Sequence, residues 1–596
     1  MKTVKRIFAV LLTVCMVMGL SVSAAAGGIT PPATSGTLTI TKAIPNATYT
    51  IYKMLDVVDW TLDDTEVTSS VYYLASDSSW KNFFVDPSKT TGDVTASSVA
   101  DYVAVTKLDG DDNYYVEWIA MSAADSTKID DIKAEEFAGK ALAYAKNPVN
   151  NVRSAASDTA DPSADPTATT SSVVFTNLPF GYYLVDTNGG AIVALDTFAA
   201  NKEIEEKNTA PTIDKQVRDK KSETNATEIW DKNNTANIGD EVSFKTTITV
   251  GAGAVGYTLH DAMTDGLTFK DVTSVELYKN TNTNAGGEPT YADTPTLTLI
   301  KKAAGVTDYH YEVKKENLCA GNIKATLDAT TTEACDFEIV FDQAIFAKDG
   351  FTVDAVTYTI AEKDKLVVTY TATLNENAVV ADAGNPNRTI LTYGVTTDTT
   401  PLKTPQDETT TYTYKFDLVK TNKKNEVLDS ATFELRPADD DGEYDASAAA
   451  ISFVEVKAAG GDEVTGYRVA TADDTPTVTI ITAGSPTITG LGNGTYYLTE
   501  IAAPDGYKKL TAPVTVTING ANIDATITPD DDGKGGNIDK LSEDKPGVQV
   551  INVKKSIFPH TGGMGTTVYY LAGGIIVALV AASAVIVFKK RQNGKV

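Results

Sequence analysis

Short runs in which apolar and polar residues alternate restrict the fold of this chain more than any other feature. In "YTYKFDLVKTN", for example, Tyr414, Phe416 and Leu418 alternate with polar or charged neighbours. Successive side chains of a strand point to opposite faces, so this spacing indicates strands with one buried face. The runs end at Gly, Asn, Asp or Pro, which favour turns. The sequence therefore predicts an all-β fold of sandwich type, with residues 130–147 as its clearest helix.

Two stretches rich in Pro and Thr predict the domain boundaries. They read "KNTAPTIDKQV", near residue 210, and "TPLKTPQDETTT", which ends at residue 411. We expect three tandem immunoglobulin-like β-sandwich domains at residues 36–209, 210–411 and 412–556. The chain of 596 residues carries a formal net charge of -28. Such an acidic surface repels polyanions and argues against a nucleic-acid partner.

Both ends of the chain predict export. Residues 1–26 combine basic residues, an apolar stretch and small residues, as in a secretory signal peptide. The uncharged run 568–588 reaches about 30 Å as a helix, the thickness of a bilayer core, and a basic tail follows it. Cys15 would leave with the signal peptide. Cys319 and Cys335 are then the pair available for one disulfide bond in an oxidising compartment.

The last predicted domain combines an inward lysine with an inward carboxyl and an inward amide. Lys420, Glu500 and Asn552 each share strand parity with apolar neighbours. Burial lowers the pKa of a lysine and raises that of a carboxyl group. A neutral Lys420 could then attack the side-chain carbonyl of Asn552, while a protonated Glu500 polarises it and carries protons. The pattern predicts a self-formed isopeptide bond, and a buried ion pair beside an amide is the alternative.

The middle domain shows the same pattern with an aspartate. Lys215, Asp261 and Asn387 have inward parity in three predicted strands, and Asn385 is the alternative amide. We expect a second bond between Lys215 and one of these amides.

The first domain holds a third set of the same kind. Lys42, Asp186 and Asn208 share parity with apolar neighbours, and Asp186 stands where the last domain has its glutamate. A third bond, from Lys42 to Asn208, is the expectation to test here.

Two parts of the chain resemble known domains of Gram-positive surface proteins. The segments "FDLVKTN", "GTYYLTEIAAPDGY" and "VINVKK" resemble collagen-adhesin B-type domains, which form such isopeptide bonds. The run "IGDEVSFKTTITV" resembles the middle domain of major pilins, in which an aspartate carries the proton. The resemblance implies the proton-carrying role for Glu500, for Asp261 and, in the first domain, for Asp186.

The C-terminal segment 557–596 resembles a cell-wall sorting signal. Such signals have the form Leu-Pro-x-Thr-Gly, followed by an apolar span and a basic tail. The matching residues here are Phe558, Pro559, His560, Thr561 and Gly562, with Phe558 in place of the usual leucine. The resemblance implies that a sortase attacks the carbonyl of Thr561 and releases the chain from Gly562 onward. The span would hold the chain at the membrane until then, and peptidoglycan would be the final attachment point.

Lys207 is predicted to face solvent at the end of the first domain. Its "EEKN" context resembles the Tyr-Pro-Lys-Asn motif of sortase-assembled pilins, although Tyr and Pro are missing. The resemblance implies that Lys207 joins one subunit to Thr561 of the next, with Lys202 as the alternative acceptor. The chain would then be the backbone subunit of a covalent pilus on the cell surface, with identical subunits and tip and basal pilins as partners. A monomeric wall-anchored adhesin, or a basal or accessory pilin, is the alternative.

An enzyme is not expected. The histidines are His260, His310 and His560, and no catalytic triad, metal-ligand spacing or phosphate loop accompanies them. The acidic runs "ADDDGEYD" and "PDDDGKGGN" lack the full spacing of a calcium loop. We therefore expect neither cofactor nor metal, and the sequence names no host ligand.

Overall fold

The structure is a computed structural model and contains two compact units. Unit 1 comprises Met1–Ala236, Asp240–Val379 and Ala383–Tyr412, and unit 2 comprises Asn237–Gly239, Val380–Asp382 and Thr413–Val596. The structure describes residues 35–45, 47–61, 67–122, 129–160, 171–186, 191–195, 199–219, 228–253, 255–282, 287–316, 318, 335–347, 349–381, 383–394, 401–439, 441–520, 522–527, 538–542, 545–555 and 565–592. The unit boundary after Tyr412 lies next to the boundary predicted after residue 411, whereas the boundary predicted after residue 209 lies inside unit 1.

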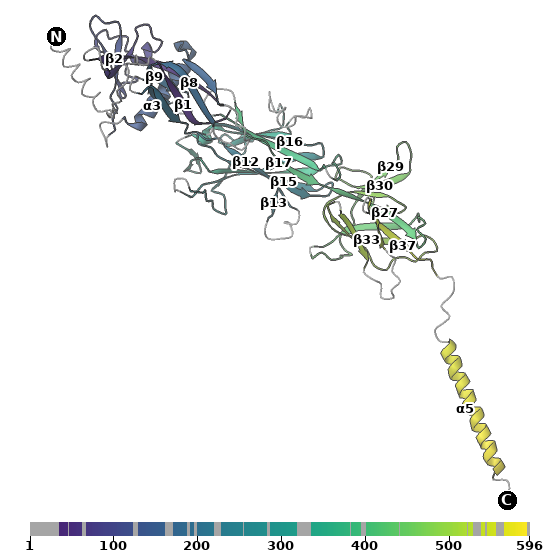
Figure 1. Ribbon diagram of the computed structural model, residues 1–596. Coiled ribbons are helices and arrows are strands. Elements are labelled where there is room, and N and C mark those ends of the chain that lie inside the picture. The colour runs from purple at the N-terminus through teal and green to yellow at the C-terminus, as the bar shows by residue number, and fades with distance from the viewer. Residues whose placement is uncertain are drawn as a thin grey trace, which may run out of the picture. The chain divides into compact units, whose positions relative to one another are not determined.

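The first half of unit 1 contains two sheets and the main helix (Figure 1). A three-stranded sheet has the order β11 (Asn201–Glu205), β1 (Ser35–Ala43) and β8 (Ser171–Pro179). An eight-stranded sheet has the order β10 (Ala191–Leu195), β9 (Gly181–Val185), β2 (Thr48–Thr61), β3 (Val67–Leu74), β6 (Tyr114–Trp118), β5 (Val103–Lys107) and β4 (Gly92–Asp93), and β7 (Ala156–Thr159) pairs with β2. The helical segments are α2 (Lys81–Phe84), α3 (Asp131–Lys146) and η1 (Pro148–Asn150).

Helix α3 confirms the helix predicted at residues 130–147. Asp130 caps its N-terminus, because its side chain accepts the backbone N–H groups of Ile132 and Lys133. The helix lies beside β9 (Figure 1) and contributes Phe137 to an apolar core. Phe137 also makes an edge contact with Trp118, with ring centroids 5.3 Å apart.

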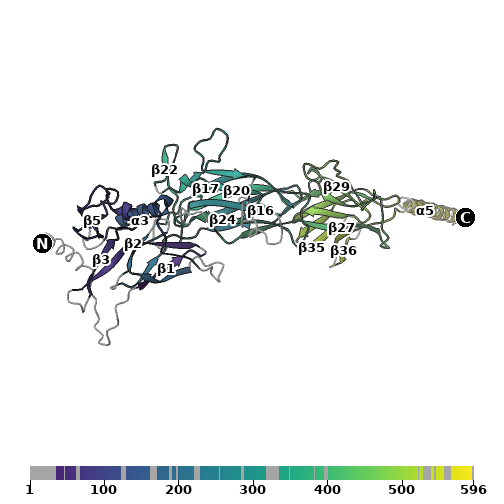
Figure 2. The same ribbon diagram turned by 90° about the horizontal axis from the view of Figure 1, so that it is seen from above.

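The second half of unit 1 is formed by two large sheets. The six-stranded sheet has the order β13 (Trp230–Asp231), β12 (Thr212–Arg218), β15 (Glu241–Thr249), β23 (Lys365–Leu374), β17 (Leu267–Tyr278) and β18 (Leu297–Thr298). The seven-stranded sheet has the order β14 (Asn233–Thr235), β26 (Asp407–Tyr412), β24 (Asn385–Gly394), β16 (Val255–Met263), β20 (Phe337–Phe341) and β19 (Tyr311–Lys314), and β25 (Leu402–Lys403) pairs with β24. Figure 2 shows β24, β16 and β20 together. The hairpin β21 (Phe351–Val353) and β22 (Val356–Tyr358) and the turn η3 (Gln343–Phe346) complete this half.

Unit 2 also contains two sheets. The six-stranded sheet has the order β29 (Phe453–Lys457), β30 (Val464–Val469), β32 (Thr487–Leu491), β27 (Tyr414–Asn422), β37 (Lys545–Asn552) and β36 (Ile538–Ser542). The five-stranded sheet has the order β31 (Ile481–Thr482), β28 (Thr432–Pro437), β33 (Gly494–Ala502), β34 (Val514–Asn519) and β35 (Asn522–Ile527). The first and last strands of the unit, β27 and β37, pair in parallel.

The all-β prediction is confirmed, since sheets make up both units. In β15 the exposed or half-buried positions alternate strictly with buried ones, as the period of a half-buried strand requires. The predicted signal peptide 1–26 and the sorting motif lie outside the described residues.

The C-terminal helix α5 (Gly565–Gln592) ends with Lys589, Lys590 and Arg591 in its last turn. Within the residues whose side chains the structure describes, no helix is long and apolar enough to cross a membrane. The predicted span also includes residues 568–574, whose side chains are not among those that the structure describes.

Candidate functional site: buried lysine, carboxyl and amide clusters

Unit 1 brings Lys215, Asp261 and Asn387 together in a cluster between its two large sheets. Lys215 lies on β12 in the six-stranded sheet. Asp261 on β16 and Asn387 on β24 come from the seven-stranded sheet, where Met263 pairs with Asn387. The strand parity that turns apolar side chains inward turns these three inward as well, and all three are 0% exposed.

Tyr370 occupies the centre of this cluster. It lies on β23 and is 0% exposed. The Lys215 ammonium nitrogen Nζ donates to Asp261 Oδ2 at 2.5 Å and to the Tyr370 hydroxyl oxygen. The Tyr370 hydroxyl donates to Asp261 Oδ2 at 2.7 Å, and Asn387 Nδ2 donates to the Tyr370 oxygen at 3.1 Å. Nucleophile, carboxyl and amide therefore meet at one phenol oxygen.

Burial favours the neutral forms of the two ionisable groups, Lys215 and Asp261, in this cluster. It lowers the pKa of Lys215, because the ammonium loses its hydration, and the attraction of Asp261 opposes this shift. It raises the pKa of Asp261 for the same reason, against the effect of Lys215 and of hydrogen bonds from Tyr370 and Asn387. A neutral amine beside a protonated carboxyl is the pair that attack on an amide requires.

Aromatic rings line the cluster and keep water out. Lys215 Nζ lies 5.6 Å from the ring centroid of Phe244 and 5.0 Å from that of Tyr370. Phe337 packs edge-on against Tyr370, with centroids 4.9 Å apart. Two buried oxygens, Asp261 Oδ1 and Asn387 Oδ1, have no hydrogen-bond partner among the described residues.

The alternative amide, Asn385, is fully buried but is hydrogen-bonded elsewhere. Its Oδ1 accepts the backbone N–H of Val379 at 2.8 Å. Its Nδ2 donates to the carbonyls of Val379 and Thr411, each at 3.1 Å. Asn385 thus holds a turn in place, and Asn387 is the amide in the cluster.

Unit 2 brings Lys420, Glu500 and Asn552 together in a second cluster. In the parallel pairing of β27 with β37, Lys420 is opposite Val550, two residues before Asn552 and on the same face. Lys420 is 0% exposed, and Glu500 and Asn552 are 1% exposed. Asn552 Nδ2 donates to Glu500 Oε2 at 3.2 Å, and Lys420 Nζ donates to the carbonyl of Val550 at 3.0 Å.

The loop after β33 fixes Glu500 in this cluster. The backbone N–H of Leu510 donates to Glu500 Oε2 at 2.7 Å, and Asn552 Nδ2 also contacts the carbonyl of Lys508. Burial lowers the pKa of Lys420 to about 8, although Glu500 pulls it the other way. Glu500 Oε1 and Asn552 Oδ1 are buried without a partner among the described residues, as are the equivalent oxygens of unit 1.

The third predicted set is not brought together, and the inward orientation predicted for Lys42 is wrong. The pairing of β1 with β8 shifts register between Thr41 and Ala43, and Lys42 adopts φ 54°. This bulge turns its side chain outward, where it is 60% exposed and pairs with Glu205 at 2.6 Å.

The other two members of that set also have different surroundings. Asp186 is buried, but its ion-pair partner is Lys146 of α3, at 2.9 Å. Asn208 is half-buried, and its backbone N–H donates to Glu206. The alternation of side chains along a strand did not predict the bulge in β1. It also did not predict the ion pair between Lys146 and Asp186.

Lys207 is exposed, as predicted, and so is Lys202. Lys207 follows β11 and precedes β12, so it lies at the junction of the two halves of unit 1. Thr561 and Gly562, together with the rest of the sorting motif, lie outside the described residues.

Cys335 is disulfide-bonded, whereas Cys319 lies outside the described residues. The Cys335 sulfur lies near ligand atoms of His260 and Glu338, an arrangement that could hold a metal ion. In the described structure Cys335 is committed to its disulfide. His260 Nδ1 pairs with Glu338 at 3.0 Å, and its Nε2 contacts Thr392.

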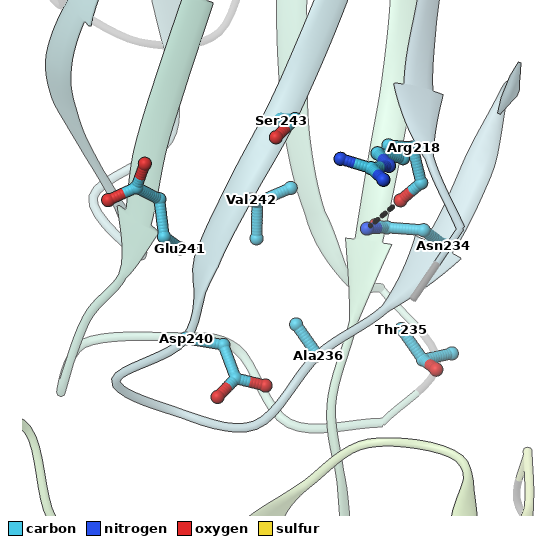
Figure 3. A pocket seen from close by; sticks show the side chains of 8 residues that line it. All are labelled: Arg218, Asn234, Thr235, Ala236, Asp240, Glu241, Val242 and Ser243. Carbon is cyan, nitrogen blue, oxygen red and sulfur yellow. Dashed lines mark hydrogen bonds between the residues drawn. The ribbon is translucent and has the colours of Figure 1, made fainter. Parts of the chain in front are cut away.

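A pocket of about 260 Å³ lies in the second half of unit 1 (Figure 3). Asn234 Nδ2 donates to the carbonyl of Arg218 there, at 2.9 Å. The pocket is lined by Arg218, Asn234, Thr235, Ala236, Asp240, Glu241, Val242 and Ser243. It contains none of the predicted site residues.

Part of unit 2 matches a known domain family. Residues 414–532 match the SpaA family of prealbumin-like fold domains. The matched residues include Lys420 and Glu500, and Asn552 follows them on β37. No protein of curated function matches the sequence.

The chain is also similar, at low identity, to solved pilin structures. One is the T6 backbone pilin of serotype M6 Streptococcus pyogenes, with 14% identity and a TM-score of 0.39 over 82% of this chain and 81% of that one. Another is the major pilin SpaD from Corynebacterium diphtheriae, with 16% identity and a TM-score of 0.40 over 87% of this chain and 98% of that one.

Sequence reasoning missed Tyr370. The signal is its inward parity in "KLVVTYTATL", between the buried Val368 and Ala372. A fully buried tyrosine hydroxyl needs a hydrogen-bond partner, so its position predicts a polar group nearby.

Proposed function

We propose that each cluster forms an intramolecular isopeptide bond, Lys215 to Asn387 and Lys420 to Asn552. The amine nitrogen attacks the side-chain carbonyl carbon of the asparagine, the carbon–nitrogen bond of the amide breaks, and ammonia leaves. The observation that carries this proposal is the shared geometry of both clusters. In each, a buried lysine from the first strand of a sandwich lies with a carboxyl and a later-strand amide in a site closed to water.

The carboxyl groups Asp261 and Glu500 would polarise the attacked carbonyl. Both carboxyl groups are buried in the same cluster as the amide, and the amide oxygen has no hydrogen-bond partner among the described residues. Fixed contact between nucleophile and carbonyl replaces the high concentration that an unactivated amide otherwise needs. The chain would thus modify only itself, with no turnover of an outside substrate.

The intact mass of the exported chain tests both bonds. Each bond releases one ammonia, so the mass should fall by about 17 Da per bond and by about 34 Da in total. Asp261→Ala and Glu500→Ala should each prevent the release of one ammonia, because the lysine and asparagine remain but the carboxyl group is gone. An unmodified mass in the parent chain contradicts the proposal.

We further propose that the chain is the backbone subunit of a covalent, wall-anchored pilus. A sortase would cleave after Thr561 and transfer its carbonyl to Lys207 of the next subunit, or finally to peptidoglycan. The exposure of Lys207 at the junction before β12 supports the acceptor role. The sorting motif and the uncharged run 568–588 support wall attachment. Two covalently clamped sandwiches suit a subunit that bears load.

A blot of wall extract separates this function from that of a monomeric wall-anchored adhesin. A ladder of covalent multimers is expected for the backbone subunit, and it should disappear in Lys207→Ala. A single band in the parent strain contradicts the pilus proposal and favours the adhesin. It leaves the isopeptide proposal intact, because the mass measurement tests that separately.

A further inference from the structure

We propose that Tyr370 is a catalytic residue of the unit 1 cluster and carries the proton from Lys215 to the departing nitrogen of Asn387. The inference rests on the proposed isopeptide function and assigns the proton transfer to the phenol rather than to the carboxyl of Asp261.

The geometry places the Tyr370 oxygen between the two nitrogens whose protons must change. It accepts a hydrogen bond from Lys215 Nζ and another, of 3.1 Å, from Asn387 Nδ2. Its own hydrogen points to Asp261 Oδ2 at 2.7 Å. Asp261 also interacts with both Lys215 and Asn387, so the carboxyl is the competing carrier that an experiment must separate.

The proton count of the reaction fits a relay through one hydroxyl. Lys215 Nζ loses one proton as it bonds to the side-chain carbon of Asn387. Nδ2 gains one proton as its bond to that carbon breaks, and it leaves as ammonia. If the Tyr370 oxygen takes the first proton while its own hydrogen turns to Nδ2, the hydroxyl is regenerated. No outside acid, base or water is consumed.

The surroundings suit a relay better than a base. Burial and the neighbouring Asp261 raise the pKa of Tyr370 well above its ordinary value, so the phenol stays protonated. A protonated hydroxyl can donate and accept in one step, whereas a phenolate could only accept. The proton of Asp261 is then available to polarise the side-chain carbonyl oxygen of Asn387.

The unit 2 cluster provides an internal control, because a carboxyl contacts its amide directly. Asn552 Nδ2 donates to Glu500, and Lys420 Nζ donates to the Val550 carbonyl. In the hydrogen bonds described for these two nitrogens, no tyrosine takes part. Tyr370→Phe should therefore affect the bond in unit 1 and leave the bond in unit 2 unchanged.

The test follows cross-linked peptides of the full exported chain over time after synthesis. For Tyr370→Phe we expect formation of the Lys215–Asn387 peptide to slow by at least about 100-fold, the usual scale of general acid–base catalysis. The Lys420–Asn552 peptide in the same molecules should form at the parent rate. Tyr393→Phe removes another buried hydroxyl from the same half of unit 1 and should leave both rates unchanged.

Solvent isotope effects distinguish proton transfer from a merely structural role. In the parent chain, the rate of bond formation in unit 1 should fall in D₂O. If the relay through Tyr370 causes this isotope effect, the residual rate of Tyr370→Phe should no longer depend on D₂O. Resistance of the variant to trypsin, measured alongside, shows whether it has folded. If Asp261→Asn is the slower variant and Tyr370→Phe matches the parent rate, the carboxyl is the carrier and the inference is wrong. If the parent and Tyr393→Phe both fail to form the unit 1 bond, the proposed function fails instead.

Discussion

Glu500→Gln should remove the covalent link of unit 2 while preserving nearly every packing contact. Glutamine has the size of glutamate, and Lys420 and Asn552 stay in place. The loss of stability in this variant therefore measures the contribution of the bond itself. The bond would close a loop of about 130 residues. The chain-entropy relation then gives about 5 kcal/mol of stabilisation, by restriction of the unfolded chain. For a unit of this size, that corresponds to a fall in melting temperature of about 15–20 °C.

Calorimetry of the exported chain, paired with intact mass, measures this effect. The Glu500→Gln chain should be about 17 Da heavier than expected for a fully cross-linked chain. One unfolding transition should move down while those of unit 1 stay. Glu455→Gln, an exposed substitution on β29, is the matched control and should change neither quantity. A variant that lacks the bond yet melts with the parent would refute the loop-entropy reasoning, and one that still loses ammonia would refute the role of Glu500.

Three further predictions concern reactivity, assembly and the first half of unit 1. Burial lowers the pKa of Lys420 to about 8, and the neutral amine is the nucleophile. The rate of bond formation in newly made chain, followed by intact mass, should therefore rise with pH up to about 8 and level off above it. Branched peptides from trypsin-digested polymer should join Thr561 to Lys207, and a branch at Lys202 would reassign the acceptor. Lys42→Ala should leave the mass loss unchanged and lower stability by less than about 1 kcal/mol in urea titration, because its ion pair with Glu205 is exposed.

Strand parity predicted the fold class and both proposed bonding clusters, and the reason is physical. A regular strand has a period of two, so an inward lysine such as Lys420 can be recognised from its apolar neighbours. Parity failed at Lys42 because a bulge adds a residue and reverses every later side chain. It also could not choose between Asn385 and Asn387, which share parity. The choice depends on hydrogen bonds to Val379 and Thr411, and these form only in the folded chain.

The absence of the predicted Lys42 link fits the path that tension would take through the proposed polymer. In that polymer each subunit would be pulled between the nitrogen of Lys207 and the carbonyl of Thr561. Residues before Lys207, including the paired strands β1 and β11, lie outside that path and need no covalent clamp.

The load-bearing path then runs through the two proposed bonds. From Lys207 it enters β12 and crosses from Lys215 to Asn387, then enters β27 and crosses from Lys420 to Asn552. The chain enclosed by each bond carries no tension, because the bond spans it. Stretching a subunit between Lys207 and Thr561 should thus extend only the short segments outside the bonds. Long unfolding steps from unit 2 should appear in Glu500→Gln, since only there can force reach the sheets that the link protects.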